Sequence, residues 1–455
     1  MDFGRKFKFT SLTLLLLGVS GCSSFSENNF QDRAKKSLEQ EVNWHTEQID
    51  AVNATKLTDL MNIPELNELI TQALENNPSV QQTLMALKII YADRTATNSD
   101  RIPQLTAGFK GDKEEDSDTS YTTDLTISWE VDLWNKIGDS TNAADQDIIS
   151  SIATLQSARD TLAADIMQAW LQINLQQQLI EIESQRLVTL ENNEIFILEK
   201  YRSGLGDLED LDTAKTTTAS TRSTLVEYQE TLAQNKRSLS VLLGQIGSSQ
   251  TVNISAEFPT VLTPLASLPE QDLGRRPDLQ SAYADIEAES YRTKAAYKAL
   301  LPSISLEVAL SDTASSPSSA LLTSPLWSIL GQLSAPIFDG GYLRSQAEIA
   351  ELTTEKAYWA YQETLLTAVN EVENALGQEK SLALQQQYLQ HAYESSLRSF
   401  KNYQSKYREG LVDISDLISA QTNSFNYKEN LVEVQYNRLV NRIVLGLALG
   451  LGVSQ

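Results

Sequence analysis

The chain contains two copies of one sequence plan, and this duplication constrains the fold more than any other feature. In each copy, 24 residues without glycine or proline separate two prolines, at 78–103 in the first copy and at 277–302 in the second. Later in each copy, residues 201–244 align without gaps with residues 407–450 at an offset of 206, with 17 identities in 44 positions. We therefore expect one structural unit that is built twice.

Each copy also holds a very long run of residues that favour a helix. Residues 139–203 contain neither glycine nor proline, and residues 342–409 contain a single glycine. At 1.5 Å per residue, the first run would span about 100 Å as a helix. Apolar residues recur along 162–201 at spacings of three, four and seven, which is typical of a coiled-coil seam. Gly204 and Gly410 follow the two runs and tolerate the positive φ of a turn, so each copy is predicted to fold as a helical hairpin.

Four other stretches alternate between apolar and polar side chains, as strands with two different faces do. The clearest stretch is 121–133, followed by 303–311, 104–110 and 329–338; the last is the weakest because Pro336 ends its pattern. Such strands suit either a half-buried soluble sheet or a membrane β-barrel, whose strands need about 9–11 residues. The predicted fold is mainly α with a β-barrel part.

A membrane barrel must close, because an open edge leaves unpaired backbone groups in lipid. Four strands are too few to enclose anything, so several chains would have to contribute. Two chains would give eight strands, which fill their interior with side chains, whereas three would give twelve, which can leave a passage. The hydroxyl and charged side chains on the polar face suit water, and this favours three chains.

The N-terminus has the features of a bacterial export signal. Three basic residues precede a short apolar core at 12–19, and Val19-Ser20-Gly21-Cys22 resembles the lipoprotein cleavage box. Cys22 is the only cysteine of the chain, so we expect it to be lipidated and to become the first mature residue. The alternative is an ordinary signal with a chance cysteine. Ser23, in place of an aspartate, favours the outer membrane over retention in the inner membrane.

Composition excludes several function classes. The chain has 36 Lys and Arg against 60 Asp and Glu, a net charge of −24, which disfavours nucleic acid as a partner. One cysteine and two distant histidines, His45 and His391, argue against a disulfide framework, a cysteine-ligated zinc site and most histidine-based catalysis. No phosphate loop or nucleophile–base arrangement is visible, so we expect neither an enzyme nor a cofactor. The four methionines form no ladder of the kind that soft-metal transport suggests.

Taken together, these features resemble the TolC-like outer-membrane efflux ducts, and specifically their lipidated NodT/OprM-type branch. Residues 268–279 contain Arg275-Arg276-Pro277-Asp278, which is similar to the segment that opens the second repeat in that branch. The segments at 130–134 and 336–341 and the two Tyr-x-x-Gly-Leu hairpin tips are also typical of the family. The resemblance covers nearly all of the mature chain.

The resemblance implies a homotrimer, in which twelve transmembrane strands close one outer-membrane barrel and the hairpins continue it as an α-helical tube in the periplasm. It implies a passive exit duct of a tripartite efflux pump for small toxic molecules or drugs. A periplasmic adaptor would join the duct to an inner-membrane transporter, which supplies the energy. The alternatives are a type I secretion duct for proteins and a non-transporting coiled-coil envelope lipoprotein. The lipid anchor and the Arg-Arg-Pro-Asp segment favour efflux over the first alternative, and the four strands argue against the second.

The predicted organisation has five parts. They are a signal peptide (1–21), a lipidated N-terminal segment (22–63), a first repeat (64–244), an inter-repeat linker of the equatorial region (245–276) and a second repeat (277–450).

By the same resemblance, the functional residues lie at the periplasmic hairpin tips, where the tube narrows. Asp416 matches the first carboxylate of the family's constriction, whereas Ser419 stands where the family has a second, and Asp413 is the candidate for the other charge. Tyr407 and Asp210 match a tyrosine–aspartate contact between hairpins. The alternative for each aspartate is a solvated residue at a helix start, where negative charge is favourable.

Two further expectations concern the same tips. Val412 stands where the family has an arginine, so the contact network between hairpins is expected to be weaker or different here. Gly204, Leu205, Gly410 and Leu411 form the predicted turns, and these are the residues that an adaptor would contact.

Overall fold

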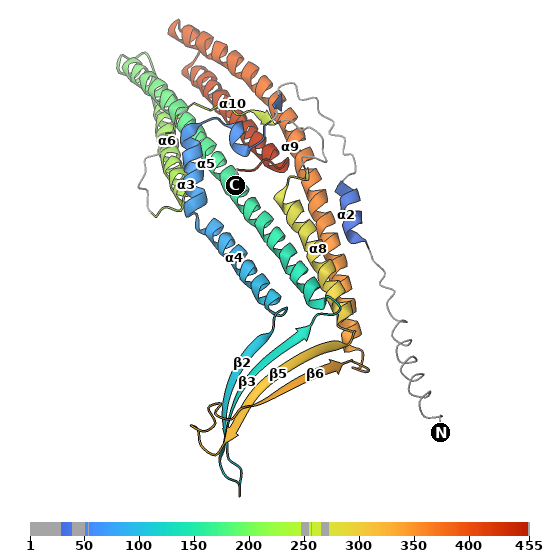
Figure 1. The fold of residues 1–455 in the computed structure, drawn as a ribbon. Coiled ribbons are helices and arrows are strands. Elements are labelled where there is room, and N and C mark those ends of the chain that lie inside the picture. Colours follow the sequence, from blue (N-terminus) through green and yellow to red (C-terminus); the bar gives the residue numbers. More distant parts are fainter. Residues whose placement is uncertain are drawn as a thin grey trace, which may run out of the picture.

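The computed structural model describes residues 29–38, 51–52, 54–246, 254–255, 257–264 and 273–453. The predicted signal peptide, the lipidation site Cys22 and His45 lie outside the described residues, as does much of the predicted linker. A curved sheet forms one end of the elongated molecule, and two helical hairpins extend to the other end (Figure 1).

The elements follow one another along the chain in an order that repeats. They are α2 (Phe30–Leu38), β1 (Ala51–Val52), the 3-10 helix η1 (Leu57–Leu60), α3 (Pro64–Asn76), α4 (Pro78–Ser99), β2 (Gln104–Asp112), β3 (Ser120–Val131), α5 (Lys136–Arg202), α6 (Leu208–Leu242), β4 (Thr263–Pro264), α8 (Pro277–Lys298), β5 (Ser303–Ala314), β6 (Leu326–Ser334), α9 (Tyr342–Arg408) and α10 (Ile414–Ala448).

The duplication seen in the sequence is a duplication of structure. Helices α4 and α8 both have 22 residues and begin at a proline, where the missing backbone N–H is not needed. Helices α5 and α9 both have 67 residues, and α6 and α10 both have 35, at the sequence offset of 206. Among the described residues, none of these helices combines the length and the apolar character needed to cross a bilayer.

The large sheet has the strand order β2-β3-β5-β6, and all neighbours are antiparallel. Its register aligns apolar residues across all four strands: Ile127 pairs with Leu105 and with Val308, and Val308 pairs with Ile329. These four side chains are exposed. The next residue of β3, Ser128, pairs with Glu307 on the other face. The sheet therefore has one apolar and one polar face.

The fourth strand differs from its prediction. It runs over 326–334 and not over 329–338, and its last pair is Ser334 with Ser303. Pro336 has no N–H to donate to a ladder, so Ile337 and Phe338 lie outside the strand and are almost fully exposed. Similarly, β3 ends at Val131, before the predicted 133, because the Asp132 carboxylate accepts a hydrogen bond of 2.8 Å from the Gly138 N–H at the start of α5.

The helices continue the sheet in the same lateral order. Helix α4 packs against α5, α5 against α8, and α8 against α9, matching the strands to which they connect. The largest core cluster lies around the middle of α5 and includes Leu57, Leu60, Ile166, Met167 and Ile443. A second cluster joins α2, α8 and α9, where Phe30 packs against Tyr358.

Candidate functional site at the hairpin tips

The two hairpin turns have the same geometry. Gly204 and Gly410 have φ angles of 75° and 73°, in the left-handed region that glycine adopts without strain. The Leu205 N–H donates to the Lys200 carbonyl and the Leu411 N–H donates to the Lys406 carbonyl, both at 2.9 Å. This is the Schellman pattern that ends a helix. The leucine after each glycine points outward, with 79% and 67% of its surface exposed.

The second helix of each hairpin begins at an aspartate. The Asp207 side chain accepts a hydrogen bond of 2.8 Å from the Asp210 N–H and so caps α6. Asp413 stands at the same place before α10, where its backbone carbonyl accepts from the Leu417 N–H at 3.3 Å. Asp207 and Asp413 are exposed, and their charge is favourable at the helix N-terminus.

An apolar cluster joins the two hairpins just behind the turns. Its buried members are Ile197, Leu211 and Ala214 from the first hairpin and Tyr407, Ile414, Leu417 and Ile418 from the second. Val412 packs against this cluster. The tips of the two hairpins are thus joined by apolar contacts.

Tyr407 belongs to this tip cluster and has one aromatic and one cationic neighbour. Its ring meets the Phe196 ring edge-on at 5.9 Å, and the Lys200 ammonium lies 4.5 Å from the ring centroid. Burial and the nearby Asp210 carboxylate raise the pKa of Tyr407. Burial also raises the pKa of Asp210, helped by the charges of Asp207, Asp413 and Glu209 and opposed by Lys200. Tyr407 and Asp210 are therefore electrostatic neighbours across the two hairpins of one chain.

Asp416 lies apart from that contact. Asp413, just before α10, and Asp416 and Ser419 in its first turns are all exposed. Asp416 occupies the position in the second repeat that Asp210 occupies in the first. The half-buried Asp210 belongs to the contact between hairpins, whereas Asp416 faces solvent in the single chain. The duplicated position thus has two different environments.

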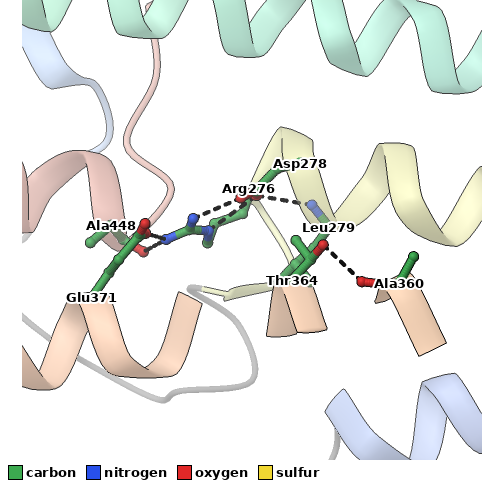
Figure 2. Close-up of polar contacts among 7 residues, drawn as sticks. All are labelled: Arg276, Asp278, Leu279, Ala360, Thr364, Glu371 and Ala448. Carbon is green, nitrogen blue, oxygen red and sulfur yellow. Dashed lines mark hydrogen bonds and ion pairs between the residues drawn. The ribbon is translucent and has the colours of Figure 1, made fainter. Parts of the chain in front are cut away.

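A second feature is the set of polar contacts around Arg276, which belongs to the Arg-Arg-Pro-Asp segment (Figure 2). The Arg276 guanidinium binds both oxygens of Asp278 at 3.1 and 2.7 Å, Glu371 of α9 at 2.7 Å and the Ala448 carbonyl at the end of α10 at 3.0 Å. Only 9% of the Arg276 side chain is exposed. One side chain therefore ties the start of α8 to α9 and α10, far from the hairpin tips.

A third feature, a polar contact between α5 and α10, was not predicted from the sequence. Below the tips, polar side chains join α5 to α10: Asn193 donates to Gln421 at 2.9 Å, and Arg186 donates to Asn426 at 3.1 Å and to Glu429 at 2.9 Å. The apolar seam expected along 162–201 is buried at Leu162, Ile166 and Ile173 but is interrupted here. Polar residues that interrupt a regular apolar seam were the signal that could have revealed this contact.

Comparisons with known proteins show which family and which relatives this chain resembles. The family described as outer membrane efflux protein matches residues 69–245 and 268–451. The cation efflux system protein CusC from Escherichia coli O6:H1 is 29% identical over 403 residues, which cover 86% of this chain and 87% of CusC. The probable outer membrane lipoprotein SilC from Salmonella typhimurium is 25% identical over 463 aligned positions, covering 98% of this chain and 99% of SilC.

A solved structure has the same fold. The crystal structure of a membrane protein from Pseudomonas aeruginosa superposes with a TM-score of 0.83 and 26% sequence identity. The superposition covers 90% of this chain and 100% of that one. The fold of this chain is therefore shared by a protein that it resembles only moderately in sequence.

Proposed function

The chain belongs to the outer membrane efflux protein family, which makes it an outer-membrane channel of an efflux system, and we propose that it works as a homotrimeric, passive exit duct for small toxic molecules. A periplasmic adaptor would join it to an inner-membrane transporter that supplies the energy. A passive duct needs neither a catalytic group nor a cofactor. Lipidation of Cys22 would add a second attachment to the outer membrane.

The observation that carries this proposal is the pair of sheet edges. Within the part of the chain that the structure describes, β2 and β6 each pair on one side only. Unpaired strand edges are not tolerated in lipid, so copies of the chain must pair β6 with β2 of the next copy. The strands alternate in direction, and this closure keeps the alternation. Three copies give twelve strands, which are enough to leave a passage.

The outermost helices support the same assembly. Helices α4 and α9 lie at the two ends of the helical layer, as β2 and β6 do in the sheet. Exposed apolar residues on α9, Leu352, Trp359 and Leu366, are spaced by seven, and Met85 and Ile89 are exposed on α4. A spacing of seven places residues on one side of a helix that packs against another helix. We propose that α9 of one copy packs against α4 of the next.

The polar sheet face favours a water-filled passage with an acidic lining. Asp124 pairs with Gly108 and Ser311, and Glu307 pairs with Ser128 on the same face. Rings of carboxylates attract cations. A second candidate cargo is therefore an inorganic cation, in line with CusC, which is named as a cation efflux system protein.

The methionines bear on that second candidate. Met61 and Met167 are fully buried in the core, and Met85 is exposed. Among the described residues, no group of three or more histidine, cysteine, aspartate and glutamate side chains is arranged to hold a metal ion. Small organic molecules, including cationic ones, are our first proposed cargo, since the four methionines of the sequence form no ladder of the thioether ligands that soft metal ions prefer.

The hairpin tips are the proposed aperture, and Asp416 provides the test. Three Asp416 carboxylates around a narrow mouth would concentrate cations there. We expect Asp416→Ala to lower the cation preference of single channels in a planar bilayer and to weaken their block by divalent cations. The control Asp212→Ala removes another exposed carboxylate near the same turns and should leave both properties unchanged. An absence of any stepwise conductance from the wild-type protein would contradict the proposed function itself.

A further inference from the structure

The seam between α5 and α10 changes character along its length. At the tips it is apolar, through the cluster around Tyr407. Nearer the core it is apolar again, where Leu175, Leu179 and Ile182 pack against Val432. Between these two apolar layers lies a polar one, which contains Arg186 and its partners. Polar side chains can replace hydrogen bonds within the protein by hydrogen bonds to water, whereas apolar side chains lose their contacts outright. The polar layer is therefore the part of the seam where α5 and α10 can separate at the lowest cost.

Two carboxylates, Glu183 and Glu429, lie at the centre of this polar layer. Among the ion pairs of the described residues, Arg186 is the only cation that contacts them. Its guanidinium lies 3.2 Å from Glu183, one turn earlier on α5, and 2.9 Å from Glu429 of α10. The ring of Phe425 lies 5.4 Å from the same guanidinium. Only 1% of the Glu183 side chain is exposed, against 14% and 15% for Arg186 and Glu429. The group is thus nearly dry and spans both hairpins.

The charges in this layer do not balance. Glu433 of α10 adds a third carboxylate near Glu429, and Tyr228 approaches from α6. Lys428 is engaged at 3.0 Å with the side-chain oxygen of Gln185. Oε1 of Glu429 is buried and has no hydrogen-bond partner among the described residues. Glu183 and Glu429 share one guanidinium; because buried carboxylates whose charge is only partly compensated are costly, this layer favours the uptake of a proton.

Burial raises the pKa of Glu183 to about 7. Arg186 opposes this rise, and the negative charge of Glu429 adds to it. A carboxyl group with a folded-state pKa above its unfolded value binds more protons when folded, so its contribution to stability is present below its ordinary pKa and is lost as the pH rises through about 7. By this sign, the contribution of Glu183 to stability is larger in mild acid than above pH 7.

We propose that Glu183, Arg186 and Glu429 form a proton-dependent latch between α5 and α10. With one proton on the pair formed by Glu183 and Glu429, the Arg186 guanidinium balances the remaining charge of that pair and the seam stays closed; the charge of Glu433 is present in both states. Without that proton, two carboxylates compete for one guanidinium, and the polar layer takes up water and loosens. The latch acts on the seam itself, and its test does not depend on whether the chain conducts ions.

The test is a distance measurement across the seam. Val188 on α5 and Tyr427 on α10 are exposed near the latch, and Val188→Cys with Tyr427→Cys would carry two spin labels. Labelled chains are diluted with unlabelled full-length chains, so that each assembly holds one labelled copy. We expect double electron–electron resonance to give a narrow distance distribution at about pH 5.5 and a longer, broader one at about pH 8.5, on either side of the titration.

Three further variants make the result specific. Glu183→Gln, which cannot ionise, should keep the narrow distribution at both pH values. Glu429→Gln leaves Arg186 to Glu183 alone and should move the change to lower pH. The control Glu227→Gln makes the same chemical change at an exposed site beside Tyr228 and should behave as the unmodified chain does. A pH-independent distribution in the unmodified chain, or an unaltered pH response in both latch variants, would overturn the proposal.

Discussion

At the scale of single residues, Arg276 shows how one side chain connects parts of the chain that lie far apart. Its guanidinium reaches Glu371 and the Ala448 carbonyl, 95 and 172 residues away in sequence (Figure 2). A planar guanidinium can serve several acceptors at once, which a lysine ammonium on a flexible stem does less well. The buried carbonyl would be the acceptor most affected by its loss, because the carboxylates of Glu371 and Asp278 are partly exposed to water.

Substituting Arg276 should therefore cost stability without removing the fold. We expect Arg276→Ala to lower the free energy of unfolding by about 1–3 kcal/mol, after allowance for the screening of the two exposed carboxylates. Arg276→Lys should recover only part of that loss. Denaturant unfolding, followed by far-UV circular dichroism in detergent, would measure both. Equal stability of the three proteins would mean that the Arg276 contacts contribute nothing net.

At the scale of elements, the turn of each hairpin is determined by a glycine that ends the first helix. Gly410 has a φ of 73°, and a side chain added there would meet no atom within 4 Å. The cost of a substitution at this turn is therefore purely a backbone cost. Gly377, in the interior of α9, also has open space around it but has no positive φ to maintain. The same substitution at the two glycines should then have opposite effects.

We expect Gly410→Ala to destabilise the chain by about 1–2 kcal/mol, because a residue with a Cβ is strained in the left-handed region. Gly377→Ala should instead stabilise it by about 0.5–1 kcal/mol, the usual gain of alanine over glycine within a helix. Thermal unfolding of the purified variants would give both signs. Two changes of the same sign would show that neighbours in the assembly, and not the backbone, decide these positions.

The sheet offers a second prediction at this scale. Ile127 lies on the apolar face and Thr126 on the polar face of the same strand, β3. We expect Ile127→Arg to cost about 2–4 kcal/mol if it lies near the bilayer midplane, and Thr126→Arg to cost much less. The amount of heat-resistant oligomer on a gel measures the difference. If the two substitutions cause equal loss, the faces do not separate lipid from water.

At the scale of the whole molecule, the proposed assembly rests on the surfaces that a single chain leaves open. The sheet ends in two edges, and the helical layer ends in α4 and α9, with exposed apolar residues on both. Exposed apolar stripes of this kind mark surfaces that are covered by a partner. Further copies of the same chain are the partner we propose, because each added copy would extend the sheet and the helical layer at once.

This assembly predicts a specific defect. Leu352→Glu combined with Leu366→Glu places two charges on the exposed stripe of α9, and we expect the double variant to lose its trimer while retaining its helix content. The control Val226→Glu changes an exposed apolar residue on α6 and should keep the trimer. Size-exclusion chromatography with light scattering distinguishes the two. An intact trimer in the double variant would exclude the α9 stripe from the interface.

Local signals in the sequence were sufficient to locate the main helices and strands. Glycine, proline and the alternation of polar with apolar residues act within a few neighbours. The hairpin turns at Gly204 and Gly410 and the four strands could therefore be located from the sequence, with errors at strand ends such as 335–338. The duplication and the family's residue pattern indicated the architecture and the tip residues, whose roles remain proposals.

Only the tertiary structure decided which distant residues meet. Arg186 and Glu429 are 243 residues apart, and their contact depends on how two separate hairpins are aligned along their length. Arg276 likewise finds its partners only when α8, α9 and α10 are packed together. A helix pattern determines which face of a helix is buried, but not the register of one helix against another, because many registers bury similar apolar area. The charge balance between α5 and α10 follows from that register and from nothing local.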